Sequence, residues 1–204
     1  YALDGNRVVL VKVDVEIDAK KPFTIPADVL SQIMATYSPN FDFEATIDGE
    51  MITVKHPIKP RIMRRTASIG EVGEEFEKVS EVLASIKEDT SYAEIHVEGK
   101  EFKRVLSDLS KLRTFAENVT LLMGKQGAKV VCKGDRVAYE NTISYASGEE
   151  REVKVRLKHL LWLKPLIGSG DFVVIRLKNE KPLHVVVLED GKEIAEALIT
   201  PIVD

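Results

Sequence analysis

Apolar and polar residues alternate along most of this chain, and this pattern predicts β-strands rather than helices. The alternating runs are separated by Asp-Gly, Gly-Lys-Gln-Gly, Lys-Gly-Asp and Ser-Gly, which are typical of hairpin turns. They cover residues 7–17, 41–56, 118–146, 151–157 and 171–199. The chain lacks the strand–helix–strand alternation that would indicate a parallel sheet. The pattern therefore predicts an antiparallel meander with a few helices, an α+β fold.

Helical spacing is confined to a few segments, at residues 25–38, 98–113 and 157–168. A further acidic segment, residues 70–92, has a weaker apolar stripe that predicts a short helix. The stripe consists of Val72, Phe76, Val79, Leu83 and Ile86. We interpret residues 70–92 as a connector between an N-terminal domain, 1–69, and a C-terminal domain, 93–204. Both domains contain a helix followed by strands, and we expect the first to lack its opening elements.

The segment 98–113 has two opposite faces when it is placed on a helix. The apolar face predicts contact with a core and consists of Phe102, Val105, Leu106, Leu109 and Leu112. The opposite face gathers Lys100, Lys103, Arg104, Ser107 and Lys111. A stripe of one charge sign favours an anionic partner. The alternative is an ordinary solvated face whose lysine stems cover the edge of the core.

Composition limits the possible functions. The chain has 204 residues, 44% of them hydrophobic and 30% charged, with a formal net charge of −4. This balance argues against a basic protein that coats nucleic acid, so any anion binding must be local. The one cysteine, Cys132, excludes an intramolecular disulfide and fits a reducing compartment. No secretory signal or membrane-spanning run is present, and the start at Tyr1 suggests a fragment or a processed chain.

Catalytic chemistry has little support in the sequence. The histidines His56, His96, His159 and His184 are scattered and lack metal-ligand spacing. No phosphate-binding loop or nucleophile motif is present. We therefore expect no catalytic residues, no metal and no cofactor, although a site assembled from distant residues stays open.

Ordered landmarks across nearly the whole chain resemble a sliding clamp of the proliferating cell nuclear antigen (PCNA) family, beginning partway into its first domain. The helix EFKRVLSDLSKL at 101–112 is similar to the family's E-F-x-R-x-x-x-D-L-S helix. The other landmarks are LDGNRVVLVKVDV at 3–15, PADVLSQIM at 26–34, MRRTASI at 63–69, KPLHVVV at 181–187 and ALITPIVD at 197–204. Their order and spacing carry the resemblance.

The resemblance implies a non-enzymatic processivity factor, a homotrimeric ring with sheets outside and helices around duplex DNA. Contacts to phosphate would be independent of base sequence and sensitive to salt. The implied DNA-binding residues are Lys100, Lys103, Arg104, Lys111, Lys158 and Lys164. Gln32, Ala35 and Ser107 stand at positions that are usually basic, so the hole would be less positive than usual. Such a protein would be cytoplasmic and nucleoid-associated, or nuclear in a eukaryote.

The resemblance also implies a docking pocket for short peptide motifs of a DNA polymerase, clamp loader, nuclease and ligase. Its matching positions are Leu3, Val8, Pro182, Leu198, Ile199, Thr200, Pro201 and Ile202. Leu198 and Ile199 could instead belong to the core. The connector differs from the family pattern, and its helix could cover the pocket or change the choice of partner.

Ring closure in the family joins edge strands of neighbouring subunits. The implied interface residues are Arg64, Arg65, Tyr139, Glu140 and Ile143. Two ordinary surface strands are the alternative. Two other interpretations of the whole chain remain: a specialised or heteromeric clamp subunit, and an α+β enzyme whose meander only resembles a clamp. A buried cluster of titratable side chains with strongly shifted pKa values would favour the enzyme.

Overall fold

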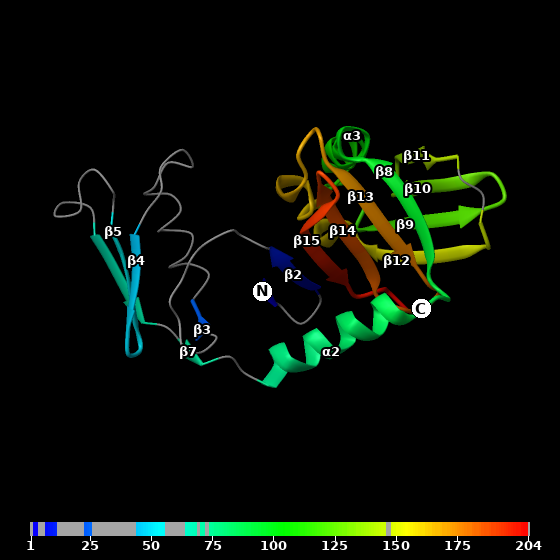
Figure 1. Cartoon of the computed structure of the whole chain (residues 1–204). Helices are drawn as coiled ribbons and strands as arrows, with labels where there is room; N and C mark the ends of the chain where they lie inside the picture. Colours follow the sequence, from blue (N-terminus) through cyan, green and yellow to red (C-terminus); the bar gives the residue numbers. More distant parts are fainter. Residues whose placement is uncertain are drawn as a thin grey trace. The chain divides into compact units, whose positions relative to one another are not determined.

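The computed structural model describes residues 2–3, 7–11, 23–25, 44–55, 64–68, 70–71, 74–145 and 148–203 (Figure 1). The chain divides into two compact units. One unit contains residues 1–13 and 79–204, and the other contains residues 14–78. The expected helix at 25–38 lies outside the described residues, except for Ile25 at its start.

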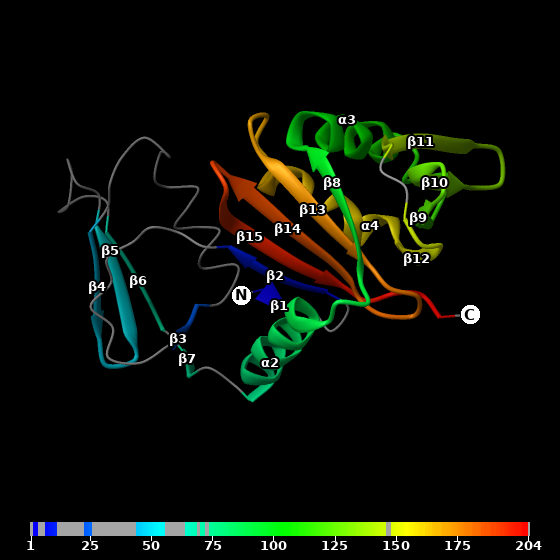
Figure 2. The same cartoon turned by 45° about the vertical axis from the view of Figure 1, so that its right-hand side comes forward.

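A six-stranded antiparallel sheet organises the larger unit. Its spatial order is β1-β2-β15-β14-β13-β8, so strands from both ends of the chain lie side by side (Figure 2). The strands are β1 (Ala2–Leu3), β2 (Arg7–Val11), β8 (Ala93–Glu98), β13 (Phe172–Leu177), β14 (Leu183–Glu189) and β15 (Lys192–Ile199). Pairing of β2 with β15 explains why residues 1–13 belong to this unit.

A four-stranded antiparallel sheet, in the order β11-β10-β9-β12, completes the strands of this unit. Its strands are β9 (Asn118–Gly124), β10 (Gly127–Lys133), β11 (Ala138–Ser144) and β12 (Arg151–Arg156). Gly127 has φ +102°, and a Cβ there would lie 2.2 Å from the Ser144 carbonyl oxygen. The tight turn after β9 therefore requires glycine at this position.

One hydrophobic core joins the two sheets to the helices α3 (Gly99–Ser110) and α4 (Leu157–Leu161). A short 3₁₀ helix, η1 (Lys164–Leu166), follows α4. Alternate residues of the strands enter this core, such as Val173 and Ile175 of β13 and Leu121 of β9. The core fixes α3 beside α4 and η1.

The described strands of the smaller unit form two small sheets. β4 (Glu44–Asp48), β5 (Met51–Lys55) and β6 (Arg64–Ser68) make an antiparallel sheet with β5 in the centre. β3 (Phe23–Thr24) pairs with β7 (Gly70–Glu71). Ile52 and Val54 of β5 are buried.

The α+β prediction is confirmed, and so are the helices expected in the connector, at 98–113 and at 157–168. The connector forms α2 (Glu74–Glu88), whereas the last segment forms only α4 and η1, since Pro165 interrupts the helix. The predicted division at 69/70 and 92/93 stays a prediction. No described helix is long and apolar enough to cross a membrane.

Candidate nucleic-acid interface and partner-docking site

Helix α3 begins at a tightly packed glycine. The Gly99 N–H donates to the Asp171 carbonyl oxygen at 2.7 Å. A Cβ at Gly99 would lie 2.6 Å from the Gly168 carbonyl oxygen. The Asp171 carboxylate in turn accepts the Gly168 N–H at 2.5 Å. These bonds hold the start of α3 against the loop that precedes β13.

The apolar face of α3 is completely buried. Phe102, Val105, Leu106 and Leu109 are each 0% exposed and belong to the main core. A helix that is anchored along its length cannot rotate, so its opposite face is presented in one orientation. The sequence predicted each of these residues correctly.

The opposite face of α3 presents exposed cations together with acidic neighbours. The side chains of Arg104 and Lys111 are 61% and 73% exposed, and they pair with Glu101 and Asp108 one turn away. The Glu101 hydrogen bond raises the pKa of Arg104. Lys100 is also exposed. Pairs between exposed groups contribute little to stability, because water and salt screen them.

The other predicted DNA-binding residues occupy more varied positions. Lys103 is half-buried, and its Nζ donates to the Ile167 carbonyl oxygen at 2.8 Å, which ties α3 to the segment after η1. Lys158 of α4 is exposed, and Lys164 of η1 is half-buried. Trp162, four positions after Lys158, is also exposed. Lys103 therefore contributes to structure, while Lys100, Arg104, Lys111 and Lys158 remain accessible.

Three of the predicted docking positions form one row across the six-stranded sheet. Leu3 is opposite Val8, and Val8 is opposite Leu198. The row continues to His184 of β14, which is opposite Leu198 on its other side. Register thus brings together residues that are almost 200 positions apart in the sequence.

Helix α2 covers this row at Leu198. Leu83 and Ile86 of α2 form a buried cluster with Leu198, and Val79 and Tyr92 pack at its margin. Figure 2 shows α2 leading through a short turn into β8, the strand at the far edge of this sheet. The connector is thus a helix seated on a predicted docking position.

A buried charge network lies next to this contact. The Lys87 Nζ of α2 donates to Glu196 at 3.0 Å and to Glu193 at 3.3 Å. The other oxygen of Glu196 accepts from His184 Nε2 at 2.6 Å. Burial alone would raise the pKa of Glu196, but the hydrogen bonds from His184 and Lys87 lower it to about 2. The carboxylate is therefore ionised and has a cation beside it.

This network was not predicted from the sequence. Its signal is a polar residue at an otherwise apolar position, His184 in LHVVV and Glu196 in AEAL. Alternation alone does not say which helix covers that face of the strands. Lys178 fixes the end of α2 further, because its Nζ lies 2.7 Å from Asp89 and 5.6 Å from the centre of the Tyr92 ring.

The remaining docking positions differ in exposure. Ile199 points into the main core and is 1% exposed. Thr200 is exposed, and Pro182, Pro201 and Ile202 are half-buried. The Ile202 N–H donates to the Lys154 carbonyl oxygen of β12 at 2.7 Å, so the end of the chain lies against the four-stranded sheet.

The predicted interface residues lie on strands at sheet edges. β6 and β11 each pair on one side only within the described residues. Glu140 of β11 bonds to Lys129 at 2.7 Å, and this bond lowers the pKa of Glu140. Tyr139 is half-buried, while Ile143 is buried in the core of the single chain. Arg64 and Arg65 belong to β6.

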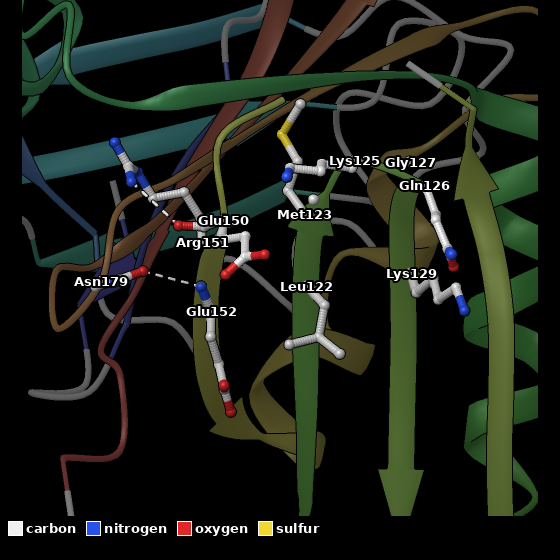
Figure 3. Close-up of a pocket in the computed structure, with 11 residues that line it drawn as sticks. Leu122, Met123, Lys125, Gln126, Gly127, Lys129, Glu150, Arg151, Glu152 and Asn179 are labelled. Atoms are coloured by element: carbon white, nitrogen blue, oxygen red, sulfur yellow. Dashed lines mark hydrogen bonds between the residues drawn. The ribbon is translucent and has the colours of Figure 1, made fainter. Parts of the chain in front are cut away.

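A concavity of about 600 Å³ lies on the four-stranded sheet near the turn before β10 (Figure 3). Lys125, Lys129 and Arg151 line it together with Glu150 and Glu152, so it carries both signs of charge. It contains no histidine or cysteine. The buried titratable network lies elsewhere, beneath α2, and its members do not line this concavity.

The described residues contain no group of three or more potential metal ligands. Cys132 is buried, and burial raises the pKa of its thiol. Its Sγ donates to the Asn118 carbonyl oxygen at 3.4 Å. The arrangement gives Cys132 the character of a core residue rather than a nucleophile.

Solved structures of clamps are similar to this chain over nearly its whole length. PCNA of A. fulgidus, bound to the C-terminal region of FEN-1, has a TM-score of 0.71 and 19% identity, covering 98% of this chain and 82% of that one. PCNA of Thermococcus kodakaraensis has a TM-score of 0.69 and 9% identity, covering 98% and 85%. The chain has the sliding-clamp fold. No protein-family model matches its sequence, and no curated protein matches it.

Bacterial clamps share the sliding-clamp fold as well. The beta subunit from the DNA polymerase of Streptococcus pyogenes has a TM-score of 0.74 and 14% identity, covering 100% of this chain and 54% of that one. The chain thus spans about half the length of that bacterial subunit. The TM-scores establish the shared fold, while at these low identities the function has to be argued from the residues described above.

Proposed function

We propose that the chain is a subunit of a DNA sliding clamp, a non-enzymatic protein that encircles duplex DNA and holds replication and repair enzymes on it. The observation that carries the proposal is the two-faced helix α3. Its apolar face is fully buried, and its other face exposes Lys100, Arg104 and Lys111 in a chain of net charge −4. Local positive charge on an acidic chain suits contacts to phosphate that do not depend on base sequence.

The proposed ring is closed by strand pairing between subunits. Within one unit of the chain, β2 pairs antiparallel with β15 through five opposed residue pairs, so strands far apart in the sequence already join edge to edge. The edges of β6 and β11 would supply the corresponding pairing between two copies, and an unpaired edge invites such association. Arg64 or Arg65 would then compete with Lys129 for Glu140. A homotrimer is the assembly we propose.

The proposed partners are a polymerase, a clamp loader, a nuclease and a ligase that bind through short peptide segments. The docking row of Leu3, Val8 and Leu198 supports this proposal, and so does the FEN-1 segment bound to the A. fulgidus protein of the same fold. The half-buried Pro182, Pro201 and Ile202 would border the site.

The test combines solution mass with retention on DNA. Multi-angle light scattering should give three times the mass of the chain, and the protein should remain on closed circular duplex but leave linear duplex by its ends. Replacing Lys100, Arg104 and Lys111 together by alanine should weaken binding to short duplex and reduce the salt slope by about 2–3. Lys181→Ala is the matched control. This exposed lysine follows the C-terminal end of β13, whereas the start of α3 lies at the other end of that strand.

Each failure has a separate meaning. A trimer that leaves circular and linear DNA equally fast would refute the encircling ring. A monomer at every concentration would refute the homotrimer and favour a heteromeric clamp subunit. An unchanged salt slope in the triple variant would refute α3 as the DNA-facing helix.

A further inference from the structure

Helix α2 lies where the proposed function places a partner peptide. Its buried residues Leu83 and Ile86 contact Leu198, one member of the docking row of Leu3, Val8 and Leu198. The docking row is thus covered at this position by the chain's own connector.

Three of the α2 side chains at this contact lie close together on one helix face, and Val79, one turn before Leu83, packs at the margin. Leu83 and Ile86 are three residues apart, and Lys87 is four residues after Leu83. The two apolar side chains meet Leu198, while the Lys87 ammonium reaches the buried carboxylate of Glu196 at 3.0 Å. Without that cation, the ionised Glu196 would keep the hydrogen bond from His184 as its one remaining partner among the described residues.

We propose, building on the docking role proposed above, that α2 is an internal occupant of the docking site and that partner segments replace it by presenting the same pattern. That pattern is a helical turn with an apolar residue, a second apolar residue three positions later, and a lysine or arginine directly after the second. The apolar pair takes the places of Leu83 and Ile86 on Leu198. The cation takes the place of Lys87 beside Glu196.

The exchange requires α2 to leave a contact with few buried side chains, although the pair of Lys178 with Asp89 also holds the residues after its end. Among the described side chains of α2, only Leu83 and Ile86 are buried, and Val82 and Ala84 on its other faces are exposed. Lys87 is itself partly open to solvent. A partner segment that matches these three groups would therefore lose little on replacing α2, and further contacts to the half-buried end of the chain would favour it.

The first experiment uses the α2 sequence itself as a probe. A fluorescent peptide of residues 77–90 is titrated into the full chain and followed by anisotropy. The chain variant Leu83→Ser with Ile86→Ser opens the site, and it should bind the peptide about tenfold or more tightly than the unchanged chain, since the competing occupant is removed. The variant Val82→Ser changes the exposed face of the same helix and should bind like the unchanged chain.

Peptide variants test the pattern. A peptide in which the lysine equivalent to Lys87 is replaced by glutamate should lose about tenfold or more in affinity for the opened chain, because like charges then meet at Glu196. A peptide with serine in place of the isoleucine equivalent to Ile86 should lose a similar factor. Equal binding of the lysine and glutamate peptides would overturn the charge requirement.

Hydrogen exchange on the unchanged chain gives a result that does not depend on a folded variant. Saturating peptide should speed exchange of the α2 amides at residues 79–88. Bound peptide with unchanged α2 protection, or equal peptide affinity of the opened and unchanged chains, would overturn the inference. Light scattering on the same samples separates the two proposals. A monomer in which peptide replaces α2 would refute the ring and leave the exchange standing. A trimer in which peptide does not replace α2 would refute the exchange and leave the ring standing.

Discussion

Lys87 pairs with two glutamates that differ in burial, and this difference allows a sharp test of what holds α2 on the sheet. The side chain of Glu196 is 2% exposed, whereas that of Glu193 is 22% exposed. The perturbation is Lys87→Met, which keeps the aliphatic stem and removes the charge. It is combined with Glu196→Gln in one double-mutant cycle and with Glu193→Gln in another.

The magnitudes follow from burial. Removing the charged partner of a buried carboxylate lowers the free energy of unfolding by about 1–3 kcal/mol. Lys87 is 39% exposed, which moves the expected coupling with Glu196 to about 1–2 kcal/mol. For the more exposed Glu193, at 3.3 Å, the expected coupling is about 0–1 kcal/mol. We therefore predict a larger coupling energy in the Glu196 cycle than in the Glu193 cycle.

The coupling should also depend on pH. The pKa of Glu196 lies below its ordinary value of 4.5, at about 2, so its ionisation stabilises the folded chain above the ordinary value. That stabilisation is lost as the pH falls from 4.5 towards 2. The Lys87 pKa is raised by Glu196 and Glu193 against the lowering effect of burial, so the cation persists to high pH. We therefore expect a constant coupling near neutral pH and a decline on acidification.

Urea unfolding is the assay. Trp162 is the single tryptophan and lies in the unit that contains α2 from residue 79 onwards, so its fluorescence and circular dichroism should report this transition. Equal coupling energies in the two cycles, or a Glu196 coupling that persists unchanged at pH 2, would refute the reasoning that burial makes Glu196 the dominant partner.

Two further predictions concern α3 and the core. Gly99→Ala should destabilise the chain by about 1–3 kcal/mol or more, because its Cβ would meet two backbone oxygens at 2.6 and 2.7 Å. Gly170→Ala, where a Cβ meets nothing within 4 Å, should have little effect in the same thermal melt. Cys132 should react with a thiol reagent only on unfolding, since it is buried and has a raised pKa, and fast labelling of the native chain would contradict this.

The helix α3 could be predicted from the sequence because its information is local. The 3.6-residue period alone predicts four of its core residues, Phe102, Val105, Leu106 and Leu109, without any tertiary contact. The role of Lys103 was not predictable, because its acceptor, the Ile167 carbonyl, lies 64 residues away. The acidic partners Glu101 and Asp108 also make the face of α3 less uniformly positive than its cations alone suggest.

The docking site was harder to predict because it depends on pairing between distant strands. The apolar stripe of α2 indicated a helix, but no pattern in residues 70–92 names Leu198 as its contact. The row of Leu3, Val8 and Leu198 appears only once β1, β2 and β15 are aligned in register. The resemblance supplied these positions as a set, and the strand register supplies a physical reason for grouping these three.

Strand β15 separates the two proposed activities by the alternation of its side chains. Ala197 and Ile199 enter the core that anchors α3, whereas Glu196 and Leu198 face α2. Because neighbouring positions on one strand serve opposite faces, substitutions of the exposed cations of α3 and of Leu83 in α2 share no described contact. Their effects on DNA binding and peptide binding should therefore add independently. Coupling would be expected only for substitutions that move the backbone of β15 itself, since this strand is common to both faces.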